Sequence, residues 1–325
     1  MRNVLNDISD IICVGDLCCD LIVPYGEMKQ TLKKKDISKS TVDKMQVRMK
    51  CGGSVSNTVR MLGQIGQHPI FVTPLKEDDL GAFLKDEMIK NDVNMDYAVR
   101  SDKSNMYCIG VLDETGERMM FCFIPPWADY PTFRKTSFDP KLYEKHAIVF
   151  SSGMAITNDN DNNEAVLYFM KRMKDNGSMI VFDLNVRAES YGYSSDRKRS
   201  FEDMIGMCDI VLGSGTDELS TVTGKDSIRE AADCILHMGN DETMTVVARN
   251  GADSIEIREK GLSDTVNVKP VRPVSTVGAG DMFDSIFIAC VRKGYDVRTC
   301  VQKASDLTGY LISQSGGTSD ISERI

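Results

Sequence analysis

The residues best suited to chemistry in this sequence form the tetrapeptide Gly278-Ala279-Gly280-Asp281, near the C-terminal end. Glycines allow the backbone to approach a ligand closely, and the first N–H groups of a helix that begins here would point at an anion. Asp281 enters the same turn, so a carboxylate able to accept a proton would lie beside the anion site. This pairing suits phosphoryl transfer from a nucleotide to a hydroxyl group. The tetrapeptide alone is equally compatible with a tight turn whose aspartate is a helix N-terminal charge.

The flanking residues predict the elements that would hold this turn. Apolar and polar residues alternate from Thr265 to Val271, which indicates a strand. After the turn, apolar residues recur at helical spacing, at Met282, Phe283, Ile286, Phe287, Ala289 and Cys290. Gly294 stands where the C-cap of that helix belongs. A strand, a glycine turn and a helix in this order would present the helix N-terminus to a ligand.

A second set of polar residues lies near the N-terminus. A short apolar run predicts a buried strand before Asp16, and Asp20 follows. A carboxylate accepts two hydroxyl hydrogen bonds well, so Asp20 suits a polyol ligand, or else it caps a turn or helix. Gly52 and Gly53 open an amphipathic helix in which Asn57 can bond a hydroxyl group, although a Gly-Gly pair is also a common helix cap.

A third set follows strands in the middle of the chain. The run from Met179 to Phe182 predicts a buried strand, after which Asp183, Asn185 and Arg187 alternate and would share one side of an extended segment. An acid, an amide and a guanidinium at a strand's carboxyl end suit phosphate and magnesium, although a structural salt bridge is the alternative. Glu218 follows another strand. The Gly-x-Gly before it is not a dinucleotide-binding motif, because Glu218 occupies the third glycine position.

Composition narrows the class of protein. The chain has 325 residues, 42% of them hydrophobic, and a formal net charge of −9. The negative charge argues against nucleic acid or an anionic membrane as the main partner. The start of the chain is polar and no run approaches the roughly 20 apolar residues of a membrane helix, so we expect no signal peptide and a cytoplasmic location. Ten cysteines without an obvious framework indicate free thiols, and three histidines argue against a histidine-rich metal site.

The order of the expected elements predicts the fold class. Strands alternate with helices along most of the chain, which favours a mostly parallel sheet with helices on both faces. Two further strands, Met106 to Leu112 and Met119 to Ile124, are expected to form a hairpin. Ligands should lie at the carboxyl ends of the parallel strands.

Taken in order, these motifs resemble the ribokinase-like (PfkB) family of sugar and nucleoside kinases. The similarity spans nearly the whole chain and is carried by Gly15…Asp20, Gly52-Gly53…Asn57, Asp78…Gly81, Asp183-x-Asn185-x-Arg187, Glu218 and Gly278 to Asp281. The resemblance implies a ribokinase-like α/β fold in a single domain over residues 1–325. It also implies a small β-sheet lid formed by about residues 21–50 and 98–125.

The same resemblance implies an activity. The protein would be a cytoplasmic carbohydrate kinase that uses ATP and Mg²⁺ to phosphorylate an alcohol group of a small sugar, as ribokinase, fructokinase and ketodeoxygluconate kinase do. Asp281 would be the general base, and the anion hole would be the backbone of Gly278, Ala279 and Gly280. The acceptor would bind Asp16, Asp20, Gly52, Gly53 and Asn57. The nucleotide and metal would lie near Asp183, Asn185, Arg187, Glu218, Arg249 and Gly251, with Glu218 reaching the metal through water.

The sequence departs from the family pattern in several places. Gly215 replaces an asparagine that accompanies Glu218, and Ser275 replaces a carboxylate that aids a monovalent cation, so we predict no potassium dependence. Family glycines are replaced at Thr73, Lys76, Asn250 and Asp253. These departures leave open a non-catalytic sensor of a sugar or nucleotide. A nucleoside kinase resembling adenosine kinase also stays open, because Gly-Gly-Ser followed by Asn-Thr is compatible with either acceptor. Because lid strands in this family often pair between subunits, the resemblance also suggests a homodimer through the lid.

Overall fold

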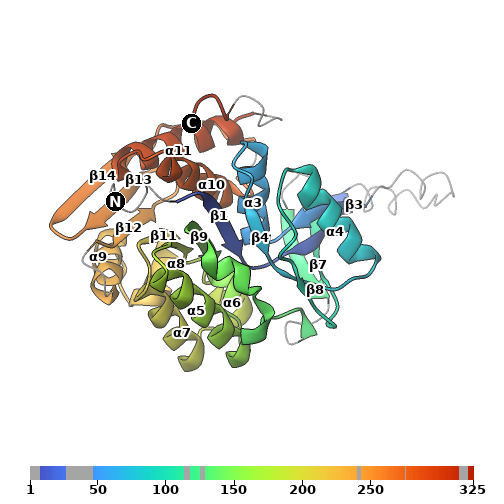
Figure 1. Cartoon of the computed structure of the whole chain (residues 1–325). Helices are drawn as coiled ribbons and strands as arrows, with labels where there is room; N and C mark the ends of the chain where they lie inside the picture. Colours follow the sequence, from blue (N-terminus) through green and yellow to red (C-terminus); the bar gives the residue numbers. More distant parts are fainter. Residues whose placement is uncertain are drawn as a thin grey trace.

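A single large sheet forms the centre of the computed structural model, which describes residues 8–26, 47–112, 118–124, 129–239, 243–274, 276–314 and 321–325. The sheet has eight strands in the order β14-β13-β12-β11-β10-β9-β1-β4 (Figure 1). They are β1 (Asp10–Val14), β4 (Ile70–Val72), β9 (Ala147–Ser152), β10 (Met179–Asp183), β11 (Ile210–Ser214), β12 (Thr245–Arg249), β13 (Ser254–Glu259) and β14 (Leu262–Asn267). From β4 to β12 the neighbours pair in parallel, and β13 and β14 add an antiparallel edge.

Helices cover both faces of this sheet, as predicted (Figure 1). Because successive side chains of a strand point to opposite faces, Ile11 and Cys13 of β1 join one apolar layer and Ile12 and Val14 join the other. The first layer contains residues of α3 (Ser54–Gln64), α10 (Ala279–Arg292) and α11 (Val297–Ile312). The second contains residues of α5 (Asn160–Asp175), α7 (Ser195–Ile205), α8 (Thr216–Thr223) and α9 (Ile228–Met238).

A separate four-stranded sheet lies next to the large one, in the order β3-β2-β7-β8 (Figure 1). Its strands are β2 (Cys18–Val23), β3 (Arg48–Gly52), β7 (Met106–Leu112) and β8 (Arg118–Ile124), and α4 (Asp79–Lys90) packs against it. The predicted hairpin is confirmed as β7 and β8, which pair antiparallel. A third, two-stranded sheet joins β5 (Pro74–Leu75) to β6 (Val99–Arg100). Parts of the predicted lid, residues 27–46, 113–117 and 125, lie outside the described residues.

The strand before the glycine turn begins and ends earlier than the alternation predicted. The expected span was 265–271, whereas β14 covers Leu262–Asn267. It pairs with β13 from Glu259 opposite Leu262 to Ser254 opposite Asn267. Because β13 begins at Ser254, backbone pairing and not the side-chain pattern determines where β14 ends.

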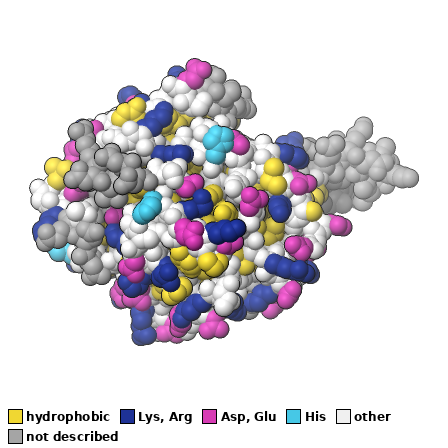
Figure 2. All heavy atoms as spheres, in the orientation of Figure 1, with side chains coloured by type: hydrophobic (Ala, Val, Ile, Leu, Met, Phe, Trp, Pro, Cys, Tyr) yellow, Lys and Arg dark blue, Asp and Glu magenta, His cyan; other side chains and the backbone are white. Residues whose placement is uncertain are grey.

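Two features of the described residues bear on membranes and on charged partners. Among the described residues, no helix combines the length and apolar character needed to cross a membrane. On the face drawn in Figure 2, acidic and basic side chains are interspersed, with apolar side chains between them.

A buried arginine fixes the segment that follows β10. Arg197 of α7 is 1% exposed, and its guanidinium donates to the carbonyl oxygens of Ile156 at 3.0 Å, Gly192 at 2.7 Å and Val186 at 2.5 Å. Val186 and Gly192 flank the short helix α6 (Ala188–Tyr191). A charged donor that satisfies several buried carbonyls at once makes the position of this segment depend on one side chain.

Replacing Arg197 with methionine should lower the free energy of unfolding by about 3 kcal/mol or more, because several buried carbonyls lose their donor together. Arg199→Met is the matched control, since Arg199 is an exposed arginine of the same helix. The control should change stability by less than about 0.5 kcal/mol. Urea unfolding followed by circular dichroism measures both, and equal midpoints for the two variants would contradict this role for Arg197.

Candidate active site

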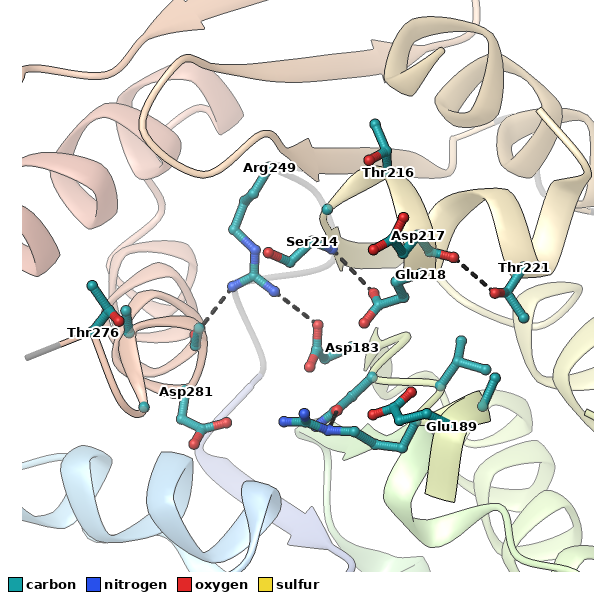
Figure 3. A pocket seen from close by; sticks show the side chains of 18 residues that line it. Asp183, Glu189, Ser214, Thr216, Asp217, Glu218, Thr221, Arg249, Thr276 and Asp281 are labelled. Atoms are coloured by element: carbon teal, nitrogen blue, oxygen red, sulfur yellow. Dashed lines mark hydrogen bonds and ion pairs between the residues drawn. The ribbon is translucent and has the colours of Figure 1, made fainter. Parts of the chain in front are cut away.

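A cavity of about 590 Å³ lies at the carboxyl ends of β10, β11 and β12, with the start of α10 as one wall (Figure 3). Parallel strands present their ligand sites at this edge, so the cavity lies where the sequence analysis expected a ligand. Its lining includes nine predicted residues, namely Asp183, Asn185, Arg187, Glu218, Arg249, Gly278, Ala279, Gly280 and Asp281. Four residues that the sequence did not predict also line it, namely Glu189, Thr216, Thr221 and Thr276.

The glycine turn forms the N-terminus of α10. Gly278 is the N-cap and has φ of 75°, a left-handed conformation that favours glycine. The Ala279 N–H donates to the Thr276 carbonyl at 3.1 Å, so that donor is already used within the turn. Among the described residues, no hydrogen-bond acceptor is found for the Gly280 N–H. The turn therefore presents the Gly280 N–H, together with the positive end of the helix dipole, to the cavity.

Asp281 is held by two side chains from α3. The Ser54 hydroxyl donates to its Oδ1 at 2.9 Å, and the Asn57 amide donates to its Oδ2 at 2.9 Å. Burial raises the pKa of Asp281 to about 7, against the two hydrogen bonds, which lower it; the charges of Asp183 and Asp16 raise it further. A carboxyl group that titrates near neutrality can accept a proton from a hydroxyl group at physiological pH.

Ser54 links Asp281 to the residues that follow β10. The Asn185 amide donates to the Ser54 hydroxyl at 2.7 Å, and the Arg187 Nε donates to Asn185 Oδ1 at 2.8 Å. Ser54 can bond a hydroxyl group but is not among the site residues predicted from the sequence. A hydroxyl directly after the Gly52-Gly53 pair was the available signal, but a serine at a helix start is ordinarily a cap.

The expectation that Asp183, Asn185 and Arg187 share one side of an extended segment is wrong. Strand β10 ends at Asp183, and both Asn185 and Arg187 have positive φ, 29° and 47°. For residues other than glycine this conformation is strained, and such strain concentrates at functional sites. The bends turn Asn185 toward Ser54, whereas Asp183 accepts a hydrogen bond from Arg249 at 2.9 Å.

Two carboxyl groups in the cavity are pushed toward their neutral forms. Glu218 Oε1 accepts from the Ser214 N–H at 3.0 Å (Figure 3). Burial and, secondarily, the charge of Asp183 raise the pKa of Glu218 to about 8. Burial also raises the pKa of Asp183, although Arg249 lowers it. Positive charge from a ligand in this cavity would favour the ionised form of both.

The same two carboxyl groups bear on whether Mg²⁺ fits here. Among the described residues, no group of three or more His, Cys, Asp or Glu is arranged to hold a metal ion by itself. Magnesium bound with a nucleotide needs only one or two carboxylates, because phosphate oxygens and water complete its octahedron. The cavity is therefore compatible with Mg²⁺ that arrives on a nucleotide.

The predicted acceptor residues lie on the other side of Asp281, toward the small sheet. Asp16 accepts hydrogen bonds from the Ser54 N–H at 2.8 Å and the Val55 N–H at 3.1 Å, so its carboxylate caps α3. Gly53 has φ of 104°, and a Cβ at this position would lie 2.6 Å from Asp16 Oδ2. Glycine is therefore required here by both conformation and space.

Asp20 and Gly251 lie outside the lining of the 590 Å³ cavity. Asp20 is a buried residue of β2, and a Cβ added at Gly52 of β3 would lie 2.2 Å from its Oδ1. Gly251 is exposed in the turn after β12, with φ of 57°. Ser275 lies outside the described residues, so the expected independence from potassium stays a prediction.

Comparisons with known proteins identify kinases as relatives of this chain. Residues 9–324 match the family model described as pfkB family carbohydrate kinase. The chain is 24% identical over 308 residues to the 5-dehydro-2-deoxygluconokinase of Clostridium perfringens, covering 92% of this chain and 89% of that one. It is 27% identical over 243 residues to the aminoimidazole riboside kinase of Salmonella typhimurium, covering 74% of each.

Solved structures share the fold at low sequence identity. The PfkB protein from Polaromonas sp. JS666 matches with a TM-score of 0.78 at 17% identity, covering 96% of this chain and 98% of that one. The fructokinase with bound ATP from Xylella fastidiosa matches with a TM-score of 0.75 at 18% identity, covering 94% and 93%.

The raised pKa of Glu218 predicts how stability depends on pH. Over the range from about 4.5 to about 8 the folded protein binds more protons at Glu218 than the unfolded chain does, so stability falls as pH rises. Between pH 6 and pH 8 the wild type should lose on the order of 2 kcal/mol that a Glu218→Gln variant retains. Glutamine keeps an acceptor for the Ser214 N–H. Urea unfolding of both proteins at the two pH values measures the difference, and parallel losses would show that Glu218 ionises normally.

Proposed function

The chain belongs to the pfkB family of carbohydrate kinases, and from this premise we propose that it transfers the γ-phosphoryl group of ATP to a hydroxyl group of a small sugar. The observation that supports the proposal most directly is the position of Asp281 in the first turn of α10, beside the first N–H groups of that helix. A proton acceptor and a set of backbone donors for an anion are within one helical turn of each other.

In the proposed reaction Asp281 is the general base. The acceptor oxygen forms a bond to the γ-phosphorus as the bond from that phosphorus to the β,γ-bridging oxygen breaks, and ADP leaves with the electron pair. The proton of the acceptor hydroxyl passes to a carboxylate oxygen of Asp281. The hydrogen bonds from Ser54 and Asn57 orient this carboxylate, since each of its oxygens already has one donor.

The backbone at the start of α10 would stabilise the negative charge of the moving phosphoryl group. The Gly280 N–H and the Asp281 N–H are available donors, since neither has an acceptor among the described residues. The Ala279 N–H would first have to leave the Thr276 carbonyl, so its contribution requires a small rearrangement of the turn. Gly278 keeps the turn open to the phosphate because it carries no side chain.

The strand ends would hold the nucleotide phosphates and their metal. Mg²⁺ bound with ATP would neutralise phosphate charge, and Glu218 and Asp183 are the carboxylates that would organise its water ligands. Arg187 and Asn185 would face the phosphates from the segment after β10. Asp16, Gly52 and Gly53 would shape the acceptor side, with Asp20 and Asn57 offering polar atoms to its hydroxyl groups.

The small sheet of β2, β3, β7 and β8 would act as the lid. It carries Asp20 and lies next to the α3 end that holds Asp281 (Figure 1). Closure over the acceptor would keep water from attacking the phosphoryl group. We propose the same sheet as the surface through which two subunits would pair.

The relatives leave both sugars and nucleosides as candidate acceptors. The named activities of two of them concern 5-dehydro-2-deoxygluconate and aminoimidazole riboside. We favour a sugar because Asp20 and Asn57 supply polar atoms suited to hydroxyl groups. A nucleoside acceptor is the alternative that the experiment below separates.

The central test is release of ADP from Mg·ATP in the presence of pooled sugars and, separately, pooled nucleosides. The wild type should release ADP with a sugar pool. Asp281→Asn should bind ATP as tightly as the wild type in calorimetry but turn over at least about 100-fold more slowly, because general-base catalysis contributes 10²–10⁴-fold. Asp86→Asn, an exposed aspartate of α4, is the control and should keep the wild-type rate.

Each outcome of this test has a separate meaning. ADP release with nucleosides alone would replace the sugar by a nucleoside acceptor. Stabilisation by a ligand without any ADP release would indicate a sensor and would overturn the kinase proposal. A near wild-type rate for Asp281→Asn would remove Asp281 from the role of base.

The pKa of Asp281 predicts the pH dependence of the reaction. Only the ionised carboxylate accepts the proton, so kcat/KM should rise with pH and level off above the pKa of about 7 in the free enzyme. Initial rates at sugar and Mg·ATP concentrations well below saturation, from pH 5.5 to pH 8.5, measure the curve. A flat profile across this range would show that no group with this pKa acts as base.

A further inference from the structure

One buried side chain connects the strand ends to the glycine turn. Arg249, the last residue of β12, is 7% exposed and directs its guanidinium toward α10. Its NH1 donates to the Gly280 carbonyl at 3.0 Å and to Asp284 Oδ1 at 2.6 Å, and its NH2 donates to Asp183 Oδ1 at 2.9 Å. Its Nε donates to the Gly213 carbonyl of β11 at 3.2 Å. The fork geometry of a guanidinium is what allows one residue to join all four places.

Asp284 is the least expected member of this cluster. It is 0% exposed, between Phe283 and the buried Ser285 of α10, and its Oδ2 has no hydrogen-bond partner among the described residues. Burial of a carboxylate with an unsatisfied oxygen costs free energy, and the Arg249 bond offsets only part of it. Asp284 lies one turn after Gly280, so both face the same guanidinium nitrogen.

The charges in this cluster show what it can contribute. One guanidinium faces the carboxyl groups of Asp183 and Asp284, so the cluster offers no net positive charge to a phosphate when both are ionised. Asp284 is also completely buried and does not line the cavity. Any effect of Asp284 on a bound phosphate must therefore pass through Arg249 and the backbone of α10.

The hydrogen bond from Arg249 to the Gly280 carbonyl is the route by which the cluster would influence a bound phosphate. The Gly280 carbonyl and the Asp281 N–H belong to one planar peptide unit, and in a trans peptide they point in opposite directions. Both residues lie in the first turn of α10, where carbonyls point toward the helix C-terminus and N–H groups toward the N-terminus, where an anion would bind. The Arg249 hydrogen bond to the Gly280 carbonyl adds a second constraint on the orientation of this peptide. The same peptide unit sets the position of the Asp281 Cα and therefore of its carboxylate.

We propose that Arg249 and Asp284 are positioning residues for the phosphate site. Asp284 orients the Arg249 guanidinium, and the guanidinium holds the Gly280–Asp281 peptide in the orientation that binds the transferring phosphoryl group. This role rests on the proposed kinase function and differs from direct contact between Arg249 and the nucleotide, which the family resemblance suggested. It acts through geometry and does not depend on the charge of Arg249 alone.

The test compares Asp284→Asn and Arg249→Lys with the wild type and with Glu256→Gln. Glu256 is a matched control, because it is 6% exposed on β13 and accepts from Arg258 at 2.8 Å, on the α9 side of the sheet and away from α10. The readout is the ratio of the dissociation constants of AMP and ATP, each measured with Mg²⁺ by titration calorimetry. That ratio isolates the binding of the β- and γ-phosphates. Thermal unfolding of each variant sets a working temperature at which it stays folded.

Both Asp284→Asn and Arg249→Lys should reduce the preference for ATP over AMP by about tenfold, the loss expected when one charge-assisted hydrogen bond no longer orients the site. ADP release by the same variants should fall at least as much, and the double variant should lose less than the product of the single losses. Glu256→Gln should lower the unfolding temperature and leave the ratio unchanged. Lysine keeps the charge of residue 249 without the fork, so it separates geometry from electrostatics.

The results that would overturn the proposal are distinct. An unchanged ratio in Asp284→Asn, or wild-type behaviour of Arg249→Lys, would contradict positioning even if both variants lose stability. An equal loss in Glu256→Gln would show a general effect of weakening the fold. A wild type that binds ATP no more tightly than AMP would remove the proposed function, and this inference with it. If Asp284→Asn does not fold, the ratio measured for Arg249→Lys and for Glu256→Gln still decides between a positioning role and a general weakening of the fold.

Discussion

The candidate site depends on the partial burial of one carboxyl group, that of Asp281. A solvated aspartate is too weak a base for work at neutral pH, and a buried aspartate without partners stays protonated. Asp281 lies between these limits because burial raises its pKa while Ser54 and Asn57 lower it again. This balance exists only where α3 and α10 pack together, which makes the contact between two helices far apart in the sequence the central requirement of the fold.

A buried ion-pair cluster between α10 and the ends of the strands supports the position of α10. Buried ion pairs are weak evidence for stability, since the cost of removing charges from water can exceed their attraction. The cluster of Asp183, Arg249 and Asp284 is better explained by what it orients, because it joins three strand ends to the first turn of α10. On the opposite face of the sheet, Arg197 fixes the position of the segment after β10 by donating hydrogen bonds to its carbonyl groups.

The arrangement divides the site into two sides with Asp281 between them. The cavity at the ends of β10, β11 and β12 is lined by acidic side chains, two arginines and the first turn of α10, whereas Asp16, Gly53 and the small sheet lie on the α3 side. Close packing at the glycines leaves no room for side chains, as at Gly52 against Asp20 and Gly53 against Asp16. The topology thus brings two polar surfaces to one carboxyl group, that of Asp281, without a dedicated domain for either.

Local patterns in the sequence determined the sheet class, the covering helices and the glycine turn. The apolar run of β1, the Gly-Gly helix start and the glycine turn at Gly278 each depend on neighbours a few residues away. Other features required the folded chain. Strand β14 ends where its partner β13 begins, and Asn185 and Arg187 bend out of the extended form. Ser54 contacts Asp281, and Asp284 contacts Arg249, across long separations in the sequence. These could not be derived from the sequence alone, because a pKa, a hydrogen bond or a register is a property of two segments that only the tertiary structure brings into contact.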